Sequence, residues 1–165
     1  MISLLKEISN NEFNKEVNVR FNNILNGFDE YPNITLDFKE LGYSEDKIIS
    51  IVEEIYDKNN GECYVDFYIS KLSDEGKANF LDMISNDDRE FFESIIKDRN
   101  DDCYFKILSK ELIAKFMRLN TREIFFVTFY FTTKPITIWG NYDLKFPCFF
   151  DTNETMEFYK EEVFN

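Results

Sequence analysis

The chain has no histidine, and its 165 residues include only five glycines and three prolines. Without histidine it cannot form a Ser-His-Asp or Cys-His catalytic group, nor a metal site with histidine ligands. The low glycine and proline content excludes a collagen-like or low-complexity chain. None of the glycines fits the patterns GxxxxGK[ST] or GxGxxG, so the common nucleotide-binding loops are excluded as well.

Cysteines and long apolar runs are also scarce. Cys63, Cys103 and Cys148 are odd in number and widely spaced, with no CxxC pair, which excludes the usual zinc and thiol-redox motifs. We expect buried thiols in a reducing compartment. The first residues lack the apolar core of a signal peptide, and the longest apolar run, residues 124–131, is far shorter than the roughly 20 residues of a membrane-spanning helix. The expected location is therefore cytoplasmic, without membrane association.

Aromatic residues are abundant. Phe occurs nineteen times and Tyr nine times, and 44% of all residues are hydrophobic. This content is too high for a disordered chain, even at a net charge of −13. A chain of this length buries roughly 70% of its unfolded surface when it folds. We therefore expect one globular domain over residues 1–165, with a substantial core.

The hydrophobic pattern changes along the chain from mostly helical to mostly extended. Helical spacing or capping residues predict helices over 10–27, 44–61, 73–84, 85–97, from 109 and from about 152. Extended patterns predict strands over 34–38, 62–69, 103–108, 123–132, 136–140 and 145–150. The last three strands have short connections, which predicts an antiparallel meander. The predicted fold class is α+β, with N-terminal and central helices packed on an antiparallel sheet that ends in this meander.

The strand predicted over 62–69 has the clearest alternation in the chain. Cys63, Val65, Phe67 and Ile69 occupy one face, and Glu62, Tyr64, Asp66 and Tyr68 occupy the other.

Acidic residues concentrate in the first two thirds of the chain. Residues 74–102 hold ten acids and four bases, whereas residues 103–165 hold eight of each. An acidic field repels nucleic acid and anionic lipid, so direct binding to either is not expected. A basic protein is the expected partner.

Three interpretations apply to the neighbouring acids Asp87-Asp88 and Asp101-Asp102. They are solvated groups at helix ends, a patch that binds a protein, or carboxylates that serve hydrolysis or hold a metal ion. The segment 57–62 resembles the start of a calcium-binding loop, but its glycine falls at position five instead of six. We therefore expect a polar turn after a helix there, and no metal or cofactor.

Two further groups have a structural and a functional interpretation. Exposed Tyr and Trp beside charged residues can form a binding hot spot, for which Tyr64, Tyr68, Trp139 and Tyr142 are candidates. Trp139 either packs beneath the meander or contacts a partner. A small basic cluster is expected to form a solvated helix face, and it comprises Lys106, Lys110, Lys115, Arg118 and Arg122.

The C-terminal third resembles a known family in three segments, REIFFVTFYF (122–131), IWGNY (138–142) and KFPCFF (145–150). They are similar to the C-terminal part of small immunity proteins encoded beside bacterial polymorphic and contact-dependent growth inhibition toxins. The resemblance covers under a fifth of the chain. It implies a cytoplasmic antitoxin that binds and blocks one cognate toxin domain, often a nuclease, and it carries over no catalytic or binding residue.

Charge and resemblance together predict a non-enzymatic immunity protein whose partner is a basic toxin domain. The acids expected to contact it are Asp87, Asp88, Glu90, Asp98, Asp101 and Asp102. One alternative is another acidic binding module, such as a phage inhibitor that mimics nucleic acid or a regulatory subunit. The other is a hydrolase or metal-dependent enzyme that uses carboxylates alone.

Overall fold

The structure is a computed structural model that describes residues 4–97 and 103–165. The strands of this part are β1 (Leu5–Ile8), β2 (Asn33–Asp37), β3 (Cys63–Asp66), β4 (Tyr104–Ile107), β5 (Phe129–Phe131), β6 (Ile136–Ile138) and β7 (Lys145–Phe150). The helices are α1 (Asn10–Glu16), α2 (Ile24–Glu30), α3 (Phe38–Leu41), α4 (Glu45–Lys58), α5 (Asp74–Met83), α6 (Asn86–Lys97), α7 (Glu111–Thr121) and α8 (Asn153–Glu162).

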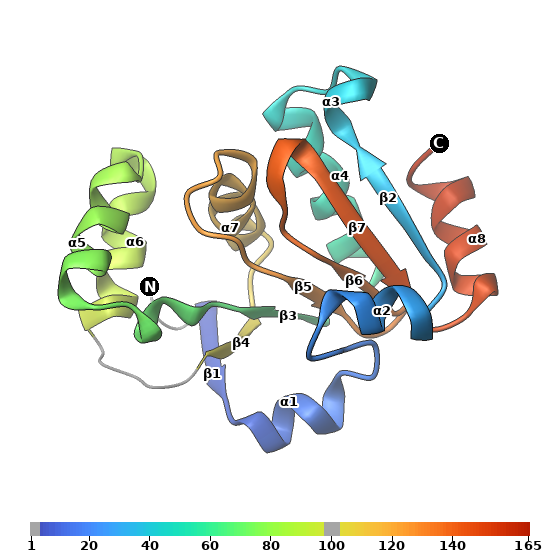
Figure 1. Cartoon of the computed structure of the whole chain (residues 1–165), viewed down its shortest axis with the longest axis horizontal. Helices are drawn as coiled ribbons and strands as arrows, with labels where there is room; N and C mark the ends of the chain where they lie inside the picture. The colour runs from blue at the N-terminus through green and yellow to red at the C-terminus, as the bar shows by residue number, and fades with distance from the viewer. Residues whose placement is uncertain (1–3, 98–102) are drawn as a thin grey trace.

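The strands form one sheet, in the order β1-β4-β3-β5-β6-β7-β2, and every neighbouring pair is antiparallel (Figure 1). The predicted α+β class is thereby confirmed. The meander β5-β6-β7 is also present, with Phe129 opposite Ile138 and Ile138 opposite Cys148.

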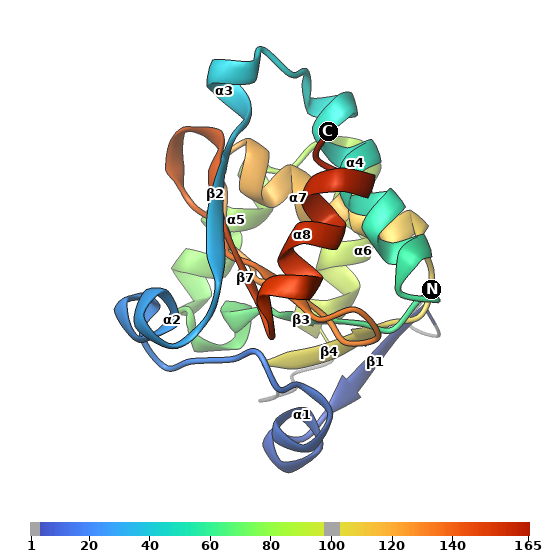
Figure 2. The same ribbon diagram turned by 90° about the vertical axis from the view of Figure 1, so that its right-hand side faces the viewer.

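One face of the sheet carries the main hydrophobic core. Val65 and Phe129 are completely buried there, as are the inward stripes of α4 and α7, which include Ile55 and Phe116. In Figure 2, α4 and α8 lie on one side of β2 and β7, whereas α2 lies on the other. Near α6, interlocking aromatic rings extend this core, and Phe67 lies 5.6 Å from both Phe92 and Phe116 between ring centroids.

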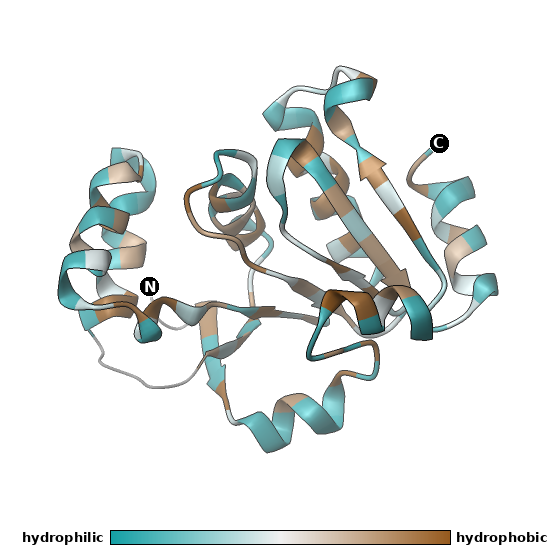
Figure 3. Cartoon of the chain, in the orientation of Figure 1, coloured by the Kyte–Doolittle hydropathy of each residue, from teal (hydrophilic) through white to brown (hydrophobic). Residues whose placement is uncertain are grey.

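The opposite face has a smaller and more polar cover. Phe13 of α1 packs with Ile8, Tyr64 and Tyr130 in a separate hydrophobic cluster. The rest of α1 is polar, as its hydrophilic colour in Figure 3 shows. Further along this face, Phe149 of β7 contacts Phe21 and Phe28.

The helices α4, α5 and α8 begin after the predicted capping residues Ser44, Ser73 and Thr152, whereas the N-cap of α1 is Ser9, one residue before the expected start at 10. Ser44 accepts a hydrogen bond from the Lys47 amide, and Ser73 accepts one from the Gly76 amide. The chain after α4 turns as expected, because Gly61 adopts a left-handed conformation at φ +77°. The helix expected from Ser109 instead begins at Glu111, and its N-cap residue, Lys110, makes no side-chain cap bond.

Three predicted elements are shorter than expected. The strand over 62–69 ends at Asp66, and a 3-10 helix follows over Tyr68–Lys71. The single helix over 10–27 is wrong, because residues 17–23 form an irregular, non-helical segment between α1 and α2. Val19 is buried in this segment, and its carbonyl accepts a 2.6 Å hydrogen bond from Thr137 of β6. The strand over 123–132 retains only β5, because Glu123 turns the chain at φ +54°. Asn120 then holds the turn by bonding both the amide and the carbonyl of Val127.

Candidate functional site: an aromatic pocket around Asp66

The acids predicted to bind a partner fall into three groups. Asp87 and Glu90 are exposed on α6. Asp98, Asp101 and Asp102 lie outside the described residues. Asp88 differs from the expectation of an exposed acid, because its side chain is only 3% exposed.

Asp88 is buried because α7 lies beside the first turn of α6. Arg118 donates two hydrogen bonds of 2.6 Å to its carboxylate, and Lys115 donates a third of 3.2 Å. Burial by itself would raise the pKa of Asp88, but the hydrogen bonds and charges of Arg118 and Lys115 outweigh it and lower the pKa. Asp88 therefore joins two helices and is not available to a partner in this structure.

All five members of the basic cluster pair with an acid from another part of the chain. Lys110 and Arg122 are exposed, as expected for a solvated face, whereas the other three are half-buried. Besides the two contacts with Asp88, the pairs are Lys106 with Glu62, Lys110 with Asp57 and Arg122 with Glu45. The charges of these five cations are therefore balanced by acids of the same chain. The chain as a whole still has 32 acids and 19 bases, so it remains strongly negative.

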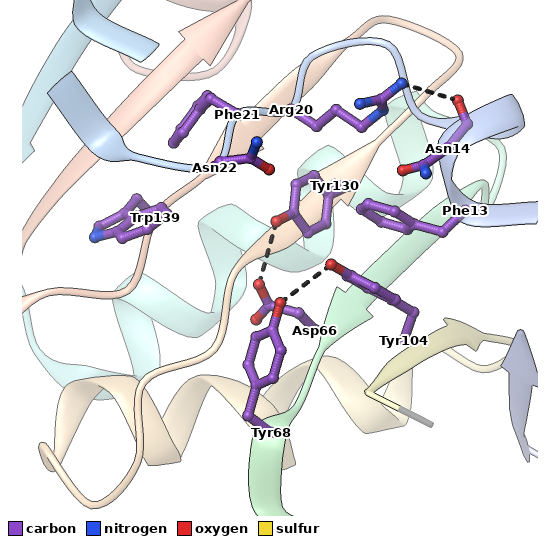
Figure 4. A pocket seen from close by; sticks show the side chains of 10 residues that line it. All are labelled: Phe13, Asn14, Arg20, Phe21, Asn22, Asp66, Tyr68, Tyr104, Tyr130 and Trp139. Carbon is purple, nitrogen blue, oxygen red and sulfur yellow. Dashed lines mark hydrogen bonds between the residues drawn. The ribbon is translucent and has the colours of Figure 1, made fainter. Parts of the chain in front are cut away.

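A pocket of about 300 Å³ opens on the polar face of the sheet (Figure 4). We call it the Asp66 pocket. Its lining consists of Phe13, Asn14, Arg20, Phe21, Asn22, Asp66, Tyr68, Tyr104, Tyr130 and Trp139. The strands supply the floor, and α1 with the non-helical segment 17–23 supplies the rim. The break between α1 and α2 is thus what places Arg20, Phe21 and Asn22 at the opening.

The aromatic walls of the Asp66 pocket support one another. Phe13 stacks on Tyr104 with ring centroids 3.9 Å apart and meets Tyr130 edge-on at 4.9 Å. On the other side, Trp139 stacks on Phe21 at 5.6 Å. Trp139 is half-buried, so it both packs beneath this face and presents a surface to the pocket. The packing expected for Trp139 is observed, and its contact with a partner stays a prediction.

Asp66 is the carboxylate at the floor of the pocket and is only 7% exposed. One of its oxygens accepts a 2.8 Å hydrogen bond from the Thr128 amide, and the other accepts a 3.1 Å bond from the Tyr130 hydroxyl. Burial raises the pKa of Asp66 to about 7, against the lowering effect of these hydrogen bonds. Among the described residues, Asp66 forms no salt bridge, so its charge has no partner within the fold.

Tyr68 and Tyr104, also beside Asp66, share a hydrogen bond between their hydroxyl groups, which lie 3.1 Å apart. Burial, together with the hydrogen bond to Tyr104, holds the pKa of Tyr68 far above its usual value. Tyr68 therefore stays neutral at physiological pH. A second hollow shares Tyr68 and Tyr104 and continues toward Ser9 and Lys71.

Arg20 lies at the rim of the pocket, and its side chain bonds to backbone carbonyls close to it in the sequence. Its guanidinium donates to the carbonyls of Val17 and Asn14, at 3.0 and 3.5 Å. In Figure 4 this group points toward Asn14 and away from Asp66. The floor of the pocket is thus negative when Asp66 is ionised, and the cation at the rim is held apart from it.

The sequence pattern predicts part of this site. The predicted alternation places Tyr64 and Asp66 on one face of β3, as observed. The strand ends at Asp66, however, and Tyr68 reaches the pocket from a 3-10 helix over Tyr68–Lys71. The covering of that face could not be predicted, because it depends on α1 and on the non-helical segment 17–23. The sequence pattern therefore places Asp66 on a face of the strand but does not predict the pocket above it.

Several other chemistries lack a suitable group in the described part of the chain. In residues 4–97 and 103–165, no three histidine, cysteine or acidic side chains are placed to hold a metal ion. Burial raises the pKa of the Cys63 and Cys148 thiols, which makes them poor nucleophiles. No helix in these ranges is sufficiently long and apolar to cross a bilayer.

Comparisons with protein-family models, with curated proteins and with solved structures find no match to this chain.

Proposed function

We propose that this chain is an immunity protein, which binds a basic toxin domain and blocks the surface that the toxin uses for its substrate. The proposal joins the resemblance in the C-terminal third to the charge of the molecule. Inhibition needs no chemical reaction, because the toxin cannot bind its substrate while this chain covers the substrate surface.

The observation that carries the proposal is the distribution of charge. The net charge is −13, and all five residues of the basic cluster form ion pairs within the fold. Acids such as Asp87 and Glu90 on α6 remain exposed. A nuclease domain that holds phosphate is basic, and opposite charges on two partners accelerate their association.

The proposed interface includes the exposed face of α6 and continues through Asp98, Asp101 and Asp102, which are included on their sequence alone. Acids at the rim of an interface act mainly on the rate of association, because they steer the approach of the partner. A central anchor has to come from larger side chains. The half-exposed aromatic residues of the Asp66 pocket are candidates for that anchor.

The decisive experiment expresses the tagged chain together with the product of the neighbouring gene and purifies it at low and at high salt. We expect a stoichiometric complex with a basic protein, an association rate that falls as salt rises, and growth of cells that the toxin alone would kill. The absence of any complex at both salt concentrations would refute the proposal. A complex with a nucleic-acid-binding protein that is not a toxin would instead identify an acidic inhibitor of another class.

A further inference from the structure

The Asp66 pocket has the features of a site for one organic cation. An ionised carboxylate offers about four sites that accept hydrogen bonds, and the fold uses two of those on Asp66. The acid is buried without a countercharge, so its ionised form is unfavourable until a cation arrives. Aromatic faces attract cations, and Trp is the most effective of them. Trp139 and the tyrosines supply such faces around the acid.

The dimensions of the pocket favour a long side chain over a single ion or water. Its volume of about 300 Å³ equals that of roughly ten water molecules in the liquid. Arginine fits the combination of walls and floor better than lysine does. Its planar guanidinium stacks on aromatic rings, donates several hydrogen bonds to a carboxylate, and loses less hydration than an ammonium group.

We propose that the Asp66 pocket binds an arginine side chain of the toxin, stacked against Trp139 and the tyrosine rings and hydrogen-bonded to Asp66. This inference rests on the proposed function, since the arginine belongs to the proposed partner. It also gives the acidic surface and the pocket different tasks. Exposed acids speed the encounter, and the buried acid slows dissociation.

Binding of a cation at this site depends on pH. The titratable side chains around Asp66 are Tyr68 and Tyr130, whose pKa values burial raises, and Tyr104. The guanidinium of Arg20 lies at the rim and points toward Asn14. Ionised Asp66 attracts the toxin's guanidinium and protonated Asp66 does not, so affinity should rise with pH up to about 8. Because the pKa of Asp66 lies at about 7, we expect a rise of roughly tenfold between pH 6 and pH 8.

The first test uses the chain without any partner. Trp139 is its single tryptophan, so its fluorescence reports on the pocket wall. The probes are arginine, lysine and citrulline, each blocked at both ends so that only the side chain differs. We expect saturable binding for arginine, weaker binding for lysine and none for citrulline, which has the same shape but no charge. Equal binding of citrulline and arginine, or no saturable response to arginine, would overturn the inference.

The second test uses the complex with the toxin. Asp66→Asn removes the charge and Tyr68→Ala removes one wall, and thermal melting shows whether each variant is folded. Asp143→Asn is the control, because it makes the same chemical change at an exposed turn. We expect Asp66→Asn to weaken toxin binding roughly 30-fold or more, mainly through faster dissociation, and the control to change it less than twofold.

The two proposals fail in different ways. If the wild-type chain binds no toxin, the proposed function is wrong, whatever the fluorescence of Trp139 shows. If it binds toxin tightly, and folded Asp66→Asn and Tyr68→Ala bind equally well, the immunity function stands and the arginine site is wrong.

Discussion

Asp66 shows how a single buried carboxylate couples stability to pH in this molecule. In the folded chain its pKa is raised to about 7, whereas in the unfolded chain it lies near the ordinary value of about 3.9. Between these values the unfolded chain has released the proton and the folded chain has not. The free energy of unfolding therefore falls as the pH rises through this window.

Replacing Asp66 with Asn should remove this pH dependence. The difference in unfolding free energy between variant and wild type should shift in favour of the variant by on the order of 2 kcal/mol from pH 5.5 to pH 8. Urea denaturation of both proteins at several pH values measures it. The absence of histidine makes the measurement clean, because few other side chains titrate in this range. A difference that stays constant with pH would contradict the assignment.

At the same scale, sequence reasoning succeeds where a residue acts through its near neighbours. Ser44 and Ser73 cap helices as predicted, because a cap bonds an amide three residues away. It fails for Asp66 and Asp88, whose surroundings come from distant elements. An acid in the first turn of a helix ordinarily faces solvent, and nothing within residues 86–97 indicates that Arg118 lies alongside.

Among the elements, α7 is joined to α6 by one buried ion pair and to α4 by a more exposed one. The Asp88 carboxylate is 3% exposed and Arg118 is 24% exposed. The pair of Arg122 with Glu45 joins α7 to α4 with comparable hydrogen bonds, but its side chains are 41% and 31% exposed. Burial, rather than the number of bonds, should decide how much each pair stabilises the fold.

Arg118→Met and Arg122→Met form a matched pair of variants. Loss of Arg118 leaves a buried carboxylate with Lys115 alone, so we expect destabilisation of about 2–4 kcal/mol. Loss of Arg122 leaves Glu45 accessible to water, so we expect at most about 1 kcal/mol. Chemical denaturation at neutral pH compares them. Equal losses would show that the contact of Asp88 with Arg118 is no stronger than a surface pair.

The elements that sequence reasoning misplaced have a common cause. Residues 17–23 have helical spacing of apolar groups, yet Val19 is held by Thr137 of β6 in a segment that forms no helix. Residues 123–128 have the composition of a strand, yet Asn120 fixes them as a turn. β1 was not predicted at all, and its pairing with β4 spans about a hundred residues. Local pattern selects among conformations only where no distant partner competes.

For the molecule as a whole, the proposed function predicts that the rate of association with the toxin depends on where the acidic residues lie as well as on the net charge. Reversing Asp87 and Glu90 to Lys changes the net charge by four units on α6. Reversing Glu154 and Glu161 to Lys makes the same change on α8, at the opposite end of the sheet (Figure 1). All four acids are exposed, so neither change should disturb the core.

If α6 faces the toxin, its double variant should associate with the toxin roughly tenfold more slowly at low salt, with little change in the dissociation rate. The α8 variant should lose less, since its charges act only through the long-range field. Stopped-flow association at increasing ionic strength separates the two, because screening within about 10 Å at 0.1 M salt should bring the rates together. Equal slowing by both variants would mean that only total charge steers the encounter, and the toxin would then have to be placed elsewhere on the surface.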